Sequence, residues 1–207
     1  MATIPVMKPK LVSTEHLSPY LKRIDSSRFY SNFGPLARLL EDRLCAHYGL
    51  GNGTATMVAN RTLGLVLALS AQNPRPGSLC LLPAWTFVAS AQAVMMAGLV
   101  PYFVDVNLET WMLDVSTVAS EMANAPGTVG AVMPVSAFGR PIDISEWDQF
   151  GSRSGVAVVI DAAAVGRFPR EDVTRSTRQT DKQHDIDIVG CLLERTPFTR
   201  AAEDQSK

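Results

Sequence analysis

Short, uninterrupted apolar runs alternate along most of the chain with segments in which apolar residues recur every three or four positions. An uninterrupted run is typical of a strand buried on both faces, and the longer spacing is typical of a helix with one buried side. The runs predict strands at 78–83, 101–106, 130–135 and 156–161. The spaced segments predict helices at 35–50, 62–72, 87–98, 114–125 and 143–154. This alternation predicts an α/β fold, a mostly parallel sheet with helices on both faces.

The alternating pattern stops at both ends of the chain. No element is predicted near His16, and the N-terminal segment is expected to be unstructured. After residue 166 the chain is rich in Arg, Asp and Thr, with one short apolar island at 186–193 that could form a strand. Such a composition buries too little apolar surface to offset the entropy of ordering. We therefore predict one α/β domain at 1–167 and an irregular, poorly ordered tail at 168–207.

Composition and charge narrow the class of protein. The chain has 207 residues, 46% of them hydrophobic, and a formal net charge of −1, which argues against a nucleic-acid partner. We recognise no signal peptide and no apolar run long enough for a membrane span. Three cysteines are scattered without the spacing of a disulfide framework or a metal site. We therefore expect a cytoplasmic protein with no membrane attachment and no metal ligands.

The first candidate functional residue is Asp161, in the stretch VAVVIDAAAVG at 156–166. It stands at the carboxyl end of the last predicted strand, and ligands of open parallel sheets bind outside those ends. A desolvated carboxylate is costly unless it pairs with a cation, and a protonated pyridine nitrogen would serve. The alanines after it would leave room for a flat ring. The alternative is that Asp161 caps the next element, since Asp is favoured at that position.

Two further features complete a candidate cofactor site. Asn60, Arg61 and Thr62 come just before an apolar helix, whose N-terminus offers N–H groups and a positive dipole end that suit a phosphate. Trp85 and Phe87 follow a predicted strand and place aromatic rings at the same sheet edge. Capping and core packing are the ordinary explanations of these residues taken singly. Together with Asp161, however, they supply the three parts needed to hold pyridoxal phosphate.

Several motifs resemble the DegT/DnrJ/EryC1/StrS family of sugar aminotransferases, which use pyridoxal phosphate and have fold type I. The resemblance covers about residues 17–166, and its motifs occur in the order and spacing of the family. These motifs are YSNFGPLARLLEDRL, NRTLGLVLAL, LLPAWTFVASAQAVMMAGLVPYFVDVN, VMPVSAFGRPIDI and VVIDAAA. The resemblance implies that the predicted domain is part of the large domain of such an enzyme.

The resemblance also implies roles for individual residues. Asp161 would pair with the pyridine nitrogen of the cofactor, and Phe87 would stack on the face of its ring. Arg61 and Thr62 would contact the phosphate through backbone N–H and hydroxyl groups. Ala164 stands near the phenolic oxygen, where many members have Gln or His, and Arg61 stands where many have Gly or Ala.

The activity implied by the resemblance is transfer of an amino group to a keto sugar. The sugar would be nucleotide-linked, the donor an amino acid such as glutamate, and the intact family members are homodimers. The lysine that holds the cofactor covalently is expected in a segment of the type S-x-H-x-x-K. Lys182 is a weak candidate, because Thr177 and Gln179 replace the serine and histidine of that pattern. A truncated chain that is inactive alone is therefore expected; the alternative is a non-catalytic half-domain that binds cofactor or a partner.

Overall fold

The computed structural model describes residues 11–48, 50, 55–164 and 187–190. The order of its elements is α1 Thr14–Ser27, α2 Pro35–Tyr48, α3 Arg61–Ala71, β1 Leu79–Pro83, α4 Val88–Met96, β2 Val100–Val104, α5 Val115–Asn124, β3 Val129–Val132, the 3₁₀ turn η1 Ala137–Gly139, α6 Ile144–Ser154, β4 Ala157–Ala162 and β5 Asp187–Gly190. Each predicted strand and helix of the α/β part is found, with its ends moved by a few residues at most.

The strands form one parallel sheet in the order β2-β1-β3-β4-β5. The predicted parallel sheet is confirmed, and the island at 186–193 contains its last described strand. From β1 the chain crosses to β2, and from β3 it crosses to β4 on the other side. The boundary between β1 and β3 is therefore the point where the winding direction reverses, and ligands of such sheets bind at the carboxyl ends beside it.

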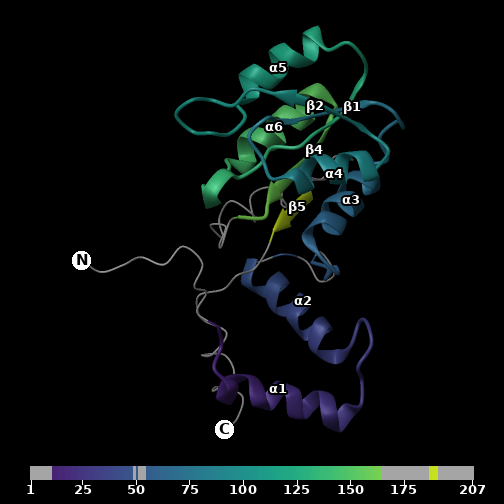
Figure 1. Ribbon diagram of the computed structural model, residues 1–207, viewed down its shortest axis with the longest axis vertical. Coiled ribbons are helices and arrows are strands. Elements are labelled where there is room, and N and C mark those ends of the chain that lie inside the picture. The colour runs from purple at the N-terminus through teal and green to yellow at the C-terminus, as the bar shows by residue number, and fades with distance from the viewer. Residues whose placement is uncertain (1–10, 49, 51–54, 165–186, 191–207) are drawn as a thin grey trace, which may run out of the picture.

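Two apolar cores hold the helices on opposite faces of the sheet (Figure 1). Successive residues of a strand point to opposite faces, so Leu81 lies in one core and Leu82 in the other. Leu81 packs with residues of α5 and α6, including Trp147. Leu82 packs with residues of α3 and α4, including Leu69 and Val94. The prediction of helices on both faces is thus confirmed.

The expectation of an unstructured start near His16 is wrong, because residues 14–27 form helix α1. The Ser13 hydroxyl lies 2.7 Å from Nδ1 of His16, and the helix ends at Arg28 in a left-handed conformation. The signal was present in the sequence, because Leu17, Leu21 and Ile24 recur at helical spacing, although Pro19 interrupts the segment and no residue of α1 is buried. Figure 1 shows α1 and α2 at the end of the molecule away from α5.

No helix in the described part of the chain has both the length and the apolar character of a membrane span. The tail predicted at 168–207 lies outside the described residues except for β5.

Candidate active site

Asp161 is the buried centre of the candidate site. It is the second-last residue of β4, and its residue surface is 5% exposed. Its backbone N–H donates to the carbonyl of Pro134, and its carbonyl accepts from the N–H of Ser136, each over 2.9 Å. These bonds continue the sheet past the end of β3 through a bridge to Val135. The position of Asp161 is thus fixed at the carboxyl edge of the sheet.

The carboxylate of Asp161 has two hydrogen-bond donors, one on each oxygen. The hydroxyl of Ser90, on α4, donates to Oδ2 over 2.8 Å. The backbone N–H of Ala163 donates to Oδ1 over 3.1 Å. This bond to the residue two positions later is a common local turn of Asp side chains. Among residues 11–48, 50, 55–164 and 187–190, no Arg, Lys or His forms an ion pair with Asp161. Asp161 is not a helix cap, because it lies within β4 and is followed by Ala162 of the same strand and a turn at 163–164.

The N-terminus of α3 lies next to the end of β4. Asn60 caps this helix, because its side-chain oxygen accepts from the N–H of Leu63 over 2.9 Å. Arg61 and Thr62 occupy the first turn of α3. The first backbone bond of the helix is donated by the N–H of Gly64 to the carbonyl of Asn60, so the N–H groups of Arg61 and Thr62 precede it. The Arg61 guanidinium donates to the carbonyl of Ala163. The candidate phosphate end and the candidate carboxylate therefore meet at one edge of the sheet.

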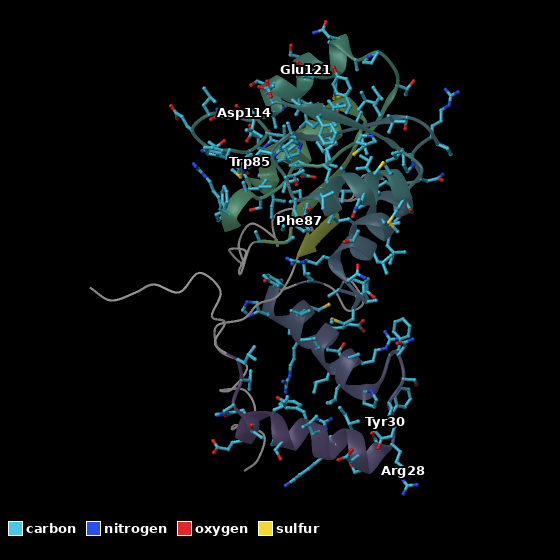
Figure 2. All side chains as sticks on the ribbon, in the orientation of Figure 1. Arg28, Tyr30, Trp85, Phe87, Asp114 and Glu121 are labelled. Atoms are coloured by element: carbon cyan, nitrogen blue, oxygen red, sulfur yellow. The ribbon has the colours of Figure 1, made fainter. Side chains whose placement is uncertain are left out.

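Phe87 occupies the position just before α4 and is 76% exposed. Ser90, which contacts Asp161, comes three residues later on the same helix start. Figure 2 shows Phe87 at the end of the α/β part that faces α2, with Trp85 farther from that end. An exposed apolar ring at the helix start that also contacts the buried carboxylate through Ser90 is suited to stacking on a flat ligand.

Trp85 belongs to a different group of rings from Phe87. Its ring centroid lies 5.1 Å from that of Trp111 and 6.3 Å from that of Phe138. The backbone φ is +60° at Trp111 and +52° at Phe138, a conformation that bulky residues rarely adopt. The sequence suggests that Trp85 and Phe87 share one sheet edge. In the structure, however, the rings near Trp85 are those of Trp111 and Phe138, and no ring contact with Phe87 is found among the described residues.

Ala164 and the loop after β3 approach each other closely. Gly139 has φ of +79°, and a Cβ atom added there would lie 2.7 Å from the carbonyl oxygen of Ala164. Lys182, the weak candidate for the cofactor lysine, lies outside the described residues. The single lysine within 11–48, 50, 55–164 and 187–190 is Lys22, on α1.

Sequence reasoning missed Ser90 and Thr86 as members of the site. The Thr86 and Ser90 hydroxyl oxygens lie 2.8 Å apart, and Ser90 has no solvent exposure. The signal was present in the motif TFVAS, where Ser90 stands three positions after Phe87 and therefore about one helical turn along from it.

The comparisons with known proteins identify the family and the fold of the chain. Residues 13–167 match the profile of the DegT/DnrJ/EryC1/StrS aminotransferase family. The chain is 32% identical over 161 residues to dTDP-4-amino-4,6-dideoxy-D-glucose transaminase of Escherichia coli, covering 78% of this chain and 42% of that protein. The chain spans about two fifths of the length of the curated relatives it matches.

Solved structures with the same fold include two examples of 30% identity or more. One is a protein of Bacillus cereus ATCC 10987 assigned as a PLP-dependent aminotransferase, with a TM-score of 0.71 and 30% identity over 81% of this chain and 46% of that one. The other is DesI, solved in the presence of its TDP-sugar product, with a TM-score of 0.63 and 32% identity over 76% of this chain and 39% of that one.

Proposed function

Because the chain belongs to the DegT/DnrJ/EryC1/StrS aminotransferase family, we propose that it forms the cofactor-holding part of a pyridoxal-phosphate-dependent aminotransferase. The reaction is transfer of an amino group from an amino acid, such as glutamate, to a keto sugar linked to a nucleotide. Relatives whose names include a dTDP-sugar transaminase and GDP-perosamine synthase support this class of acceptor. A homodimer in the cytoplasm is the state proposed for the complete enzyme.

The burial of Asp161 is the observation that carries the proposal. A buried carboxylate held by two neutral donors, and by no cation within the described residues, favours a cationic ligand group. A pyridine nitrogen that carries a proton has the required charge and a single N–H donor. Each oxygen of Asp161 retains acceptor capacity beyond its present bond. The residues of this edge therefore fit the ring end of pyridoxal phosphate.

The other proposed contacts follow from the same edge. The first turn of α3, with Arg61 and Thr62, would hold the phosphate through N–H groups, a hydroxyl and the positive end of the helix dipole. Phe87 would cover one face of the ring, and Ala164 would lie near its phenolic oxygen. In this arrangement the chain binds the group at both ends, so the ring has one orientation.

When bound, pyridoxal phosphate supplies an electron sink for the amino transfer. The part of this chain is to keep the ring nitrogen protonated through Asp161 and to exclude water from that pairing. Both follow from the buried position of the carboxylate at the end of β4.

A second candidate function is a cofactor-binding domain without transaminase activity of its own. The observation that favours it is the position of Lys22, the single described lysine, on α1 rather than at the edge that carries Asp161. Borohydride reduction in the presence of pyridoxal phosphate, followed by peptide mapping, separates the two candidates. Stoichiometric labelling of one lysine, such as Lys182, with turnover of amino donor supports the enzyme; reversible binding without a labelled lysine supports the binding domain.

Titration of the purified chain with pyridoxal phosphate tests the cofactor assignment itself. The tryptophan fluorescence should report saturable binding, and Asp161→Asn should weaken it about tenfold or more, because a bond between charged groups is lost. Asp114→Asn is the matched control: Asp114 bonds to Asn107 at the start of α5, where no cofactor contact is proposed. Absence of binding, or equal weakening by both variants, would reject the assignment.

A further inference from the structure

Ser90 is a fully buried hydroxyl that none of the proposed cofactor contacts uses. A serine within a helix usually bonds to a carbonyl of its own helix or points to solvent. Ser90 instead reaches a residue 71 positions later and donates to Oδ2 of Asp161 over 2.8 Å. The hydroxyl oxygen of Thr86 lies 2.8 Å from that of Ser90. Three side chains thus form a continuous hydrogen-bonded row that ends on the proposed cofactor ligand.

The direction of this row follows from the number of hydrogens. An ionised carboxylate has no hydrogen to donate, so Ser90 donates to Asp161. The Ser90 hydroxyl has a single hydrogen, and that hydrogen is then in use. Thr86 must therefore donate to Ser90. In such a chain each donor polarises the next, so Thr86 strengthens the bond that Ser90 makes.

The two bonds to Asp161 come from different elements and fix both oxygens. Ser90 on α4 fixes Oδ2, while the Ala163 N–H fixes Oδ1. The last torsion of an aspartate is broad, so a carboxylate without such partners samples many orientations. A ligand N–H that must meet a carboxylate oxygen in line gains affinity when that oxygen is held in place beforehand.

We propose that Ser90, supported by Thr86, is a positioning residue that orients Asp161 toward the ring nitrogen of pyridoxal phosphate. This inference rests on the proposed function, and it adds a role for two residues that touch no cofactor atom in that proposal. It also gives a reason for a hydroxyl at position 90, where an alanine would fill the helix equally well.

The test is a double-mutant cycle on the full chain, with the dissociation constant of pyridoxal phosphate as the readout. Ser90→Ala should weaken binding about tenfold, because the Asp161 carboxylate is no longer held in place before the cofactor arrives. Asp161→Ala should weaken it at least as much. In the Asp161→Ala background, Ser90→Ala should have no further effect, since there is no carboxylate left to orient.

Ser78→Ala is the matched control, because Ser78 is also a buried serine and its hydroxyl bonds to the carbonyl of Arg75 at the start of β1. It should leave the dissociation constant unchanged. Thr86→Val leaves both bonds to Asp161 in place and should weaken binding about threefold. This variant keeps the inference testable if Ser90→Ala does not fold.

Three results would overturn the inference. If the unmodified chain binds no pyridoxal phosphate, the proposed function fails and this inference fails with it. If the unmodified chain binds, Asp161→Ala weakens binding and Ser90→Ala and Thr86→Val do not, the cofactor assignment stands and the role of Ser90 is rejected. Equal losses from Ser90→Ala with and without the Asp161 carboxylate would likewise show that Ser90 does not act through Asp161.

Discussion

The backbone N–H of Met57 donates to Oε1 of Glu41 over 2.8 Å, and this bond joins α2 to the segment that leads into α3. Glu41 is buried, and its other oxygen accepts from the guanidinium of Arg38 over 3.1 Å. The hydrogen bond from the Met57 N–H is the main reason that the pKa of Glu41 lies below its ordinary value of 4.5. The guanidinium of Arg38 lowers it further. The link between α2 and the start of α3 therefore depends on an ionised carboxylate.

Replacing Glu41 by Gln should make the free energy of unfolding of the chain less dependent on pH in the acidic range. A carboxyl group whose pKa is lowered by folding stabilises the native state above its unfolded pKa, and this contribution is lost as the pH falls through the folded pKa. Urea unfolding of both chains should therefore show Glu41→Gln less stable at pH 7, with the difference shrinking below pH 4.5. Glu109→Gln, at an exposed position, is the control. A difference that is constant with pH would contradict the prediction.

Cys80 should be inert toward thiol reagents in the native chain. Cys80 belongs to β1 and its side chain packs in the core against α3 and α4, with no exposed surface. Burial raises the pKa of its thiol to about 12. The thiolate is the reactive form, so reaction at pH 8 should require unfolding. In a Cys191→Ser chain, Ellman's reagent should detect no thiol before denaturant is added and both Cys45 and Cys80 afterwards. Rapid native labelling of Cys80 would show that the core opens there.

Gly139→Ala should destabilise the chain more than Gly77→Ala. Both glycines have positive φ, +79° and +77°, so each replacement carries a similar conformational cost of about 1 kcal/mol. Only at Gly139 would the added Cβ also meet backbone, at 2.7 Å from the carbonyl of Ala164, while nothing lies within 4 Å at Gly77. Thermal unfolding of the two variants measures the difference. Equal losses would mean that the 139 loop and Ala164 separate without cost.

Phe87→Ala should weaken binding of pyridoxal phosphate while changing stability little. The ring of Phe87 is 76% exposed, so its removal from the free chain loses little packing. Stacking on the cofactor face is worth about 1 kcal/mol or more, which corresponds to roughly fivefold in affinity. Phe138→Ala is the control, because Phe138 is 80% exposed but lies beside Trp85. Equal effects of the two variants on affinity would remove Phe87 from the site.

The sequence predicts the α/β part well because its physical signal is local. An uninterrupted apolar run such as LCLLP at Leu79–Pro83 has few alternatives to a buried strand. The edge that carries Asp161 also follows from a general rule, since parallel strands all end at the same edge. The start of α3 meets that edge through the bond from Arg61 to Ala163.

The parts that sequence reasoning misses depend on contacts between distant segments or on unusual backbone. The bond from Ser90 to Asp161 requires the register of α4 against β4, which no local pattern contains. The grouping of Trp85 with Trp111 depends on a positive φ at Trp111, and nothing in the residue type of a tryptophan predicts that conformation. Helix α1 carries Leu17, Leu21 and Ile24 at helical spacing, but it contains Pro19 and buries no residue against the α/β part, so neither its pattern nor its packing stands out.

The bond from Arg61 to Ala163 also has a consequence for protein synthesis, because it joins residues 102 positions apart. On the ribosome, α3, α4 and the first strands emerge before β4, and Ser90 is made long before its acceptor Asp161. Until β4 enters the sheet beside β3, the candidate site has no carboxylate and the Arg61 side chain has no acceptor at Ala163. Nascent chains arrested before residue 157 should therefore bind no cofactor, whereas capacity to bind should appear when β4 has left the exit tunnel.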